Sequence, residues 1–78
     1  MSHLDLSDRH PATQEKIRWL TPNPRLPEGP PATVSAMCFD LGVKLVGQCK
    51  DGPQLTIALQ HLIDTKDAAV RQAIADQE

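Results

Sequence analysis

The four residues Lys50–Pro53, written KDGP, decide the fold because they separate two long segments of helical periodicity. Gly52 can adopt the backbone angles that end a helix, and Pro53 suits the first position of the next helix, where its missing N–H is not needed. We therefore expect helices over residues 31–49 and 53–75. A turn this short requires the two helices to lie side by side in opposite directions.

Apolar side chains recur along both expected helices with alternating steps of four and three, which is typical of a coiled-coil seam. The seam consists of Val34, Cys38, Leu41, Leu45 and Gln48 in the first helix, and of Leu55, Leu59, Leu62, Lys66, Ala69 and Ala73 in the second. Phe39, Val43 and Val46 form a second apolar stripe on the first helix. One neighbouring helix cannot cover both stripes, so the second one needs the amino-terminal segment or another copy of the chain.

The amino-terminal part of the chain has a different character. Residues 1–9 are polar and terminal, which is typical of loosely ordered segments. The His10-Pro11 pair predicts the start of a short helix that ends at Trp19 or Leu20. The segment Thr21–Pro31 holds five of the seven prolines, which predicts a stiff, extended arm.

The predicted fold class is therefore all-α. Residues 1–30 form a short helix and a proline-rich arm, and residues 31–78 form an antiparallel helical hairpin. The chain has 78 residues, with one Trp, one Phe and no Tyr. A core this poor in large side chains gives a lone copy little stability, so we expect the hairpin to form a homo-oligomer.

Composition excludes several classes of function. The formal net charge of −2 argues against a broad basic face for DNA. No apolar run approaches the roughly 20 residues of a membrane span, and no signal peptide opens the chain. The histidines and cysteines lack the spacing of a metal site, and no phosphate-binding glycine loop occurs. We expect a cytosolic protein that has no cofactor, metal, DNA or membrane partner, whereas spacing alone leaves a catalytic Cys-His pair open.

Lys66 stands in the middle of the apolar stripe of the second helix, where a cation is unusual. Its stem could cover apolar surface while the ammonium reaches water. It could instead fix register or oligomeric state by pairing with a carboxylate, the possible partners being Asp40, Asp64 and Asp67. In a third interpretation it attracts a phosphate, together with Thr65 and Arg71, whose guanidinium can donate two hydrogen bonds to one phosphate. Pattern alone leaves all three open.

The chain resembles a family of small phage proteins, the helical-hairpin sponges of phage anti-defence that act against CBASS and Thoeris immunity. The resemblance rests on DGPQLTIALQHLIDTKDAAVRQAIA (residues 51–75) and FDLGVKLVGQ (residues 39–48), with weaker support from HPATQEKIRWLTPNPRLP (residues 10–27). This chain departs from the family at Ser35, where members often have a basic residue, and at Gln54-Leu55, where many have Arg-Glu.

Members of that family are oligomers, hexamers in the studied branches, and sequester immune signalling nucleotides without cleaving them. The resemblance implies that this chain is not an enzyme and that it binds a cyclic oligonucleotide or a cyclic ADP-ribose isomer in the cytoplasm of an infected bacterial host. The basic groups of this chain lie instead at Lys44, Lys50, Lys66 and Arg71.

Three further residues are candidates for contact with such a ligand. Trp19 could stack on a base, or it could anchor the short helix on the hairpin. Arg18 and Arg25 could reach a phosphate, or they could be solvated surface charges. The prolines of the arm could hold Asn23 and Arg25 over a pocket with little entropy left to lose on binding.

A helical protein–protein adaptor is the alternative interpretation. A hairpin that oligomerises and presents its second apolar stripe to a protein partner explains the same pattern without a nucleotide.

Overall fold

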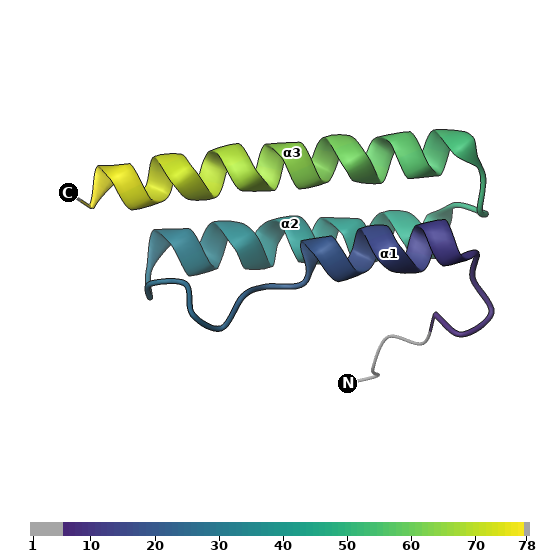
Figure 1. Cartoon of the computed structure of the whole chain (residues 1–78), viewed down its shortest axis with the longest axis horizontal. Helices are drawn as coiled ribbons and strands as arrows, with labels where there is room; N and C mark the ends of the chain where they lie inside the picture. Colours follow the sequence, from purple (N-terminus) through teal and green to yellow (C-terminus); the bar gives the residue numbers. More distant parts are fainter. Residues whose placement is uncertain (1–5, 78) are drawn as a thin grey trace.

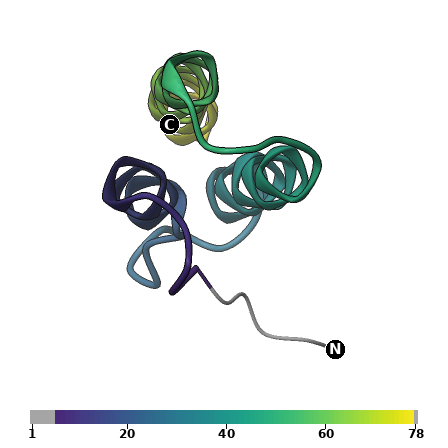
Figure 2. The same ribbon diagram turned by 90° about the vertical axis from the view of Figure 1, so that its right-hand side faces the viewer.

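The computed structural model describes residues 6–77, and within this range the chain is all-helical, with three helices and no strand. The helices are α1 (Pro11–Leu20), α2 (Pro30–Gln48) and α3 (Pro53–Asp76), and each begins with a proline at its first position. α2 and α3 run side by side in opposite directions (Figure 1), and α1 lies against both of them (Figure 2). The two long helices begin and end within one residue of the predicted positions.

The core forms where the three helices meet. It consists of Ile17 and Leu20 from α1, Val46 from α2, and Leu55, Leu59, Leu62 and Ile63 from α3. Leu6 and Phe39 pack against this cluster from its edge. The second apolar stripe of α2 is therefore covered in part by the amino-terminal segment, which is one of the two coverings that the sequence left open.

The predicted seam of α2 is wrong in its position. Leu41 is 48% exposed, whereas Ser35 and Gly42, which lie outside the seam, are buried. The physical reason is that α2 must face α1 and α3 at once. Its buried line consequently runs between the two apolar stripes, along Pro31, Ser35, Gly42 and Val46.

Gly42 lets α1 approach α2 closely. A Cβ atom placed on Gly42 would lie 2.7 Å from Cδ1 of Leu20, and Leu20 is fully buried. A Cβ atom on Gly47, in the last turn of the same helix, would meet nothing within 4 Å. The small size of residue 42 is thus a packing requirement.

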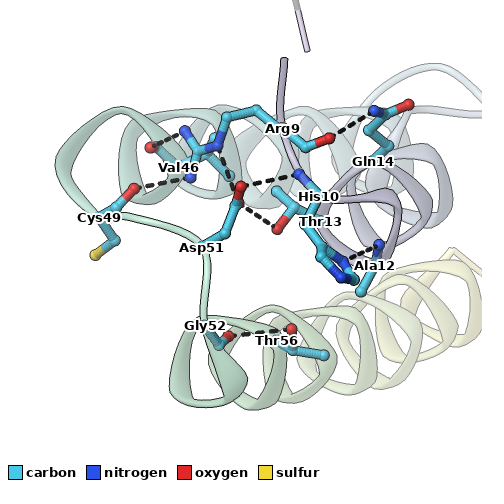
Figure 3. Close-up of polar contacts among 10 residues, drawn as sticks. All are labelled: Arg9, His10, Ala12, Thr13, Gln14, Val46, Cys49, Asp51, Gly52 and Thr56. Carbon is cyan, nitrogen blue, oxygen red and sulfur yellow. Dashed lines mark hydrogen bonds and ion pairs between the residues drawn. The ribbon is translucent and has the colours of Figure 1, made fainter. Parts of the chain in front are cut away.

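A polar cluster around Asp51 joins α1 to the turn between α2 and α3 (Figure 3). The Asp51 carboxylate accepts hydrogen bonds from the His10 N–H at 2.8 Å and from the Thr13 hydroxyl at 2.8 Å, both at the start of α1. The same carboxylate accepts from Nε of Arg9 at 3.0 Å. It therefore satisfies the backbone N–H of His10, the N-cap residue of α1, while Nδ1 of the His10 ring accepts from the Ala12 N–H at 3.0 Å.

Arg9 satisfies backbone carbonyls at the C-terminal end of α2. Its two terminal nitrogens donate to the carbonyls of Val46 at 2.9 Å and Cys49 at 2.8 Å, which lie at the end of α2. A cation at a helix C-terminus satisfies carbonyls that have no partner within the helix. We name Arg9, His10, Thr13 and Asp51 the clasp. The expectation of loose order through residue 9 is wrong for residues 6–9, and residues 1–5 lie outside the described part.

The clasp lowers the pKa of Asp51 below its ordinary value of 3.8. The main cause is the hydrogen bond from the His10 backbone, followed by that from the Thr13 hydroxyl, and Arg9 adds to both. Each of these donors favours the ionised carboxylate. A lowered folded-state pKa means that the clasp contributes its full stability above the unfolded-state pKa and loses it as the pH falls through the folded-state value.

The proline-rich arm joins α1 to α2 and is less extended than predicted. The side chain of Asn23 accepts a hydrogen bond from the Arg25 N–H at 2.9 Å, and the Asn23 carbonyl accepts from the Leu26 N–H at 3.1 Å. Asparagine favours such turns because its side chain imitates a backbone acceptor. Gly29, whose φ of 93° suits glycine, ends the arm at the start of α2. No helix in the described part is long and apolar enough to cross a membrane.

Alanine at residue 42 should make the protein less stable than alanine at residue 47 by about 1–3 kcal/mol, because only the first overpacks the core. Gly47→Ala alone should raise stability by about 0.5–1 kcal/mol through helix propensity. Urea denaturation followed by circular dichroism measures both variants. Equal stabilities would mean that α1 does not pack closely against Gly42.

Asp51→Asn should lower the melting temperature at pH 7, and the difference from wild type should shrink as the pH falls below about 4, where wild type also loses the charge. Asp40→Asn is the control, since its only ion pair is an exposed one with Lys44 at 2.9 Å. A difference between wild type and Asp51→Asn that stays constant from pH 7 to pH 2.5 would contradict the assigned role of the carboxylate.

Candidate functional site

A pocket of about 210 Å³ lies where the arm, the first turns of α2 and the second half of α3 meet. Its lining combines the arm residues Thr21, Asn23 and Leu26, the α2 residue Ser35, and the α3 residues Lys66, Asp67, Val70 and Arg71. Three segments that are far apart in the sequence thus contribute polar groups to one hollow. We call it the arm pocket.

Lys66 lines this pocket with a side chain that is only 17% exposed. Its ammonium lies 2.9 Å from the carboxylate of Asp67, the next residue on the helix. The sequence offered three carboxylates as partners, and the structure selects the one that shares the pocket. The buried stem agrees with the first interpretation of Lys66, and the position of the ammonium in a polar hollow agrees with the third.

Arg71 supplies the second cation of the arm pocket. It lies one turn beyond Asp67, at a spacing that allows an ion pair between the two side chains. The structure pairs Asp67 with Lys66 instead, and within residues 6–77 the guanidinium of Arg71 has no hydrogen bond or ion pair. A guanidinium without a partner at the edge of a hollow is free to donate two parallel hydrogen bonds to an anion.

Ser35 brings a hydroxyl to the floor of the pocket. The residue is 2% exposed, and its hydroxyl has no hydrogen-bond partner in the described part of the chain. No fully enclosed polar side-chain atom lacks a partner among the described residues, so this hydroxyl keeps its small contact with solvent through the pocket that it lines. Buried hydroxyls are normally hydrogen-bonded, and an exception in a pocket indicates a place for a ligand or water.

The structure brings together only some of the predicted site residues. Lys66 and Arg71 line the arm pocket, as does Asn23 of the arm. Arg25 is exposed outside the lining, and Thr65 is exposed with its hydroxyl donating to the His61 carbonyl at 2.9 Å.

Trp19 and Arg18 also lie outside the pocket lining. Trp19 is 62% exposed, so the interpretation of this residue as the anchor of α1 is wrong, because Ile17 and Leu20 do the anchoring. Its ring stays accessible, two residues before Thr21 in the lining. Arg18 is exposed in the last turn of α1, where a cation stabilises the negative end of the helix dipole.

Sequence reasoning noted Ser35 as a departure from the family but did not place it in a site. A usable signal was present: Ser35 precedes Lys50 by as many residues as Lys66 follows Asp51. In an antiparallel pair of helices, residues equally far from the turn lie at the same level. Only the rotation of α2, which the structure supplies, turns Ser35 inward rather than outward.

Two other hollows are weaker candidates. One of about 280 Å³ adjoins the clasp, where Asp51 and Thr13 already satisfy each other. The other, of about 330 Å³, lies at the tip of the α2–α3 pair and has a mostly apolar lining that includes Leu45, Leu55 and Ala58. Neither contains a polar side chain that lacks a partner and is as buried as Ser35, so the arm pocket is the best-supported site.

No model of a known protein family matches this chain, and no curated protein or solved structure matches it. The fold and the site therefore define its class from its own residues. It is a small all-helical protein whose described part carries a pocket with two cations, one carboxylate and one buried hydroxyl. The two cations of the lining, Lys66 and Arg71, are groups that can bind an anionic ligand.

Ser35→Ala should leave the free energy of unfolding unchanged or raise it by up to about 1 kcal/mol, since the lost hydroxyl has no hydrogen-bond partner among residues 6–77. Thr13→Val removes an equally buried hydroxyl that does bond to a carboxylate, and it should destabilise by at least about 1 kcal/mol. Urea denaturation compares the two. A loss of stability in Ser35→Ala as large as in Thr13→Val would assign Ser35 to the structural framework and not to a site.

Proposed function

We propose that this protein is a phage anti-defence sponge, which binds a cyclic nucleotide immune signal and holds it without cleaving it. The observation that carries the proposal is the arm pocket, where Lys66, Arg71 and the buried residue Ser35 line one hollow, and the Arg71 guanidinium has no partner in the described part of the chain. The similarity of residues 39–48 and 51–75 to the helical-hairpin sponges gives this anion-binding pocket a class of ligand. Sequestration needs affinity and slow release but no chemistry.

The arm pocket is large enough for one phosphate of the ligand and the atoms next to it. A volume of about 210 Å³ is below the range of about 300–1,000 Å³ that is usual for sites enclosing a drug-sized ligand. A cyclic oligonucleotide therefore extends beyond it. Trp19, 62% exposed, offers a flat ring on which a base can stack, for about 1–3 kcal/mol.

Other copies of the chain supply the rest of the binding surface in this proposal. Met37 is 63% exposed and Leu41 is 48% exposed, and the two lie one turn apart on the same face of α2, where they offer an apolar surface to another copy of the chain. We propose that the α2–α3 hairpin oligomerises through this surface, as a hexamer if it follows the family, in the cytoplasm of an infected bacterial cell. The proposed assembly also explains how a small chain with one Trp, which is exposed, and one Phe reaches adequate stability.

A protein–protein adaptor is the second candidate. The observation that favours it is the same exposed apolar surface, together with the apolar hollow of about 330 Å³ at the helix tip. A helix of a partner protein could lay its apolar face there. An adaptor needs neither Arg71 nor Ser35, and this separates the two candidates experimentally.

Wild-type protein should gain several degrees in melting temperature with at least one member of a panel of cyclic oligonucleotides and cyclic ADP-ribose isomers. A free ligand concentration of about 100 times Kd adds about 2.7 kcal/mol to the free energy of unfolding. The ligand should be recovered intact after denaturation. Indifference to the whole panel, with capture of a specific protein, would favour the adaptor.

Arg71→Ala should weaken ligand binding by at least about tenfold, because a charged hydrogen-bonding group is worth about 1.5–3 kcal/mol. Lys66→Ala should do the same. Lys44→Ala is the control, since Lys44 is exposed and pairs with Asp40 outside the pocket. Isothermal titration calorimetry gives the affinities, and size-exclusion chromatography checks the assembly. Normal affinity in both Arg71→Ala and Lys66→Ala would mean that the ligand binds outside the arm pocket.

A further inference from the structure

The charges in the arm pocket suggest which kind of phosphate it accepts. The charged residues of its lining are Lys66, Arg71 and Asp67, so two cations share the hollow with one anion. Asp67 is not a bystander, because its carboxylate lies 2.9 Å from the ammonium of Lys66. The formal charge of the lining is consequently a single positive charge.

We propose that Asp67 makes the arm pocket selective for a phosphodiester and against a terminal phosphate monoester. This inference rests on the proposed function, since it concerns the same site. A phosphodiester carries one negative charge, whereas a monoester carries about −1.5 to −2 at pH 7 because its second pKa is near 6. One net positive charge in the lining matches the diester and leaves the second charge of the monoester without a partner.

The geometry explains why Asp67 opposes the second charge. The Arg71 guanidinium has no partner among residues 6–77 and can take the first anionic oxygen at once. A second anionic charge on the ligand can pair with Lys66 only by displacing the carboxylate of Asp67 from it. The displaced carboxylate then stays close to the ligand and repels its negative charge. Two like charges at such distances repel appreciably when solvent is partly excluded. Asp67 is 44% exposed, so water screens part of this repulsion and the expected effect is moderate.

The selectivity has a clear use for a protein that sequesters. A cell contains many linear nucleotides with terminal phosphates, and these would fill a pocket that accepted any phosphate. A signal closed into a ring through its phosphates has no terminal monoester. A carboxylate in the pocket therefore rejects the common competitors at a small cost in affinity for the ring.

The test compares a cyclic dinucleotide with its linear form, in which one diester has been opened to a terminal 5′-phosphate. Both are titrated at pH 8 and constant ionic strength into wild type, Asp67→Asn and Asp64→Asn. Asp64 is exposed on the same helix, pairs with Gln60 and does not line the pocket, so Asp64→Asn is the matched control. Circular dichroism verifies that all three proteins are folded.

Asp67→Asn should raise the affinity for the linear form by about tenfold and for the cyclic form by less than about threefold, since only the linear form carries the second charge at one phosphate. Asp64→Asn should change neither by more than about twofold. Equal gains for both forms in Asp67→Asn, or no gain, would overturn the inference while leaving the proposed function in place.

A second arm tests the pocket without any nucleotide. Methyl phosphate and dimethyl phosphate are titrated at pH 8 into ¹⁵N-labelled protein, and the amide shifts of residues 65–71 are followed by NMR. Dimethyl phosphate should shift them more than methyl phosphate in wild type, and the order should reverse in Asp67→Asn. If no nucleotide binds but the two ions give these shifts, the proposed function is refuted and the inference about Asp67 stands. Equal shifts from the two ions, or no shifts, would refute the inference.

Discussion

The structure depends on one carboxylate that joins segments distant in the sequence. Asp51 accepts from His10 and Thr13 at the start of α1, and it also holds Arg9, which closes the last carbonyls of α2. The Arg9–Asp51 ion pair thus satisfies backbone groups at two helix ends, the start of α1 and the end of α2, that have no partner within their own helix. Without this constraint, a helix of 10 residues such as α1 would have little reason to stay in one place, because isolated helices of that length are marginal.

Everything that forms the arm pocket follows from the placement of α1. The clasp fixes its first turn, and Ile17 and Leu20 fix its last turn in the core, next to Gly42. The arm therefore starts at the fixed end of α1, Leu20, and must reach the start of α2 at Pro30. Its path brings Asn23 and Leu26 over α3. The pocket is therefore assembled by tertiary packing, with the cations on a rigid helix and the cover on a short turn.

The clasp and the arm pocket contain similar groups but differ in how they are satisfied. In the clasp, every described donor to Asp51 lies between 2.8 and 3.0 Å from the carboxylate, and this pairing supports the fold. In the arm pocket, Arg71 and the hydroxyl of Ser35 lack protein partners in the described part of the chain. A buried polar group left unpaired, such as the Ser35 hydroxyl, costs stability in the free protein and can regain it on binding, and the exposed Arg71 guanidinium is open to an anion. That contrast is the physical basis for assigning structure to one cluster and binding to the other.

The sequence by itself determined the secondary structure, and of the six predicted site residues only Lys66 and Arg71 line the arm pocket. Proline at the start of each helix and the KDGP turn fixed the helix ends to within one residue, because these residues act through local backbone geometry. The position of Lys66 in an apolar stripe was visible for the same reason, since helical periodicity is local.

Only the tertiary structure decided which side of α2 is buried and which groups meet. Two apolar stripes compete on that helix, and the choice between them depends on where α1 docks. This docking is set by Arg9 and Asp51, which are 42 residues apart and form no recognisable motif. The inward position of Ser35 and the pairing of Lys66 with Asp67 follow from that packing. Local preferences cannot determine them, because the energies that decide arise between segments and not within them.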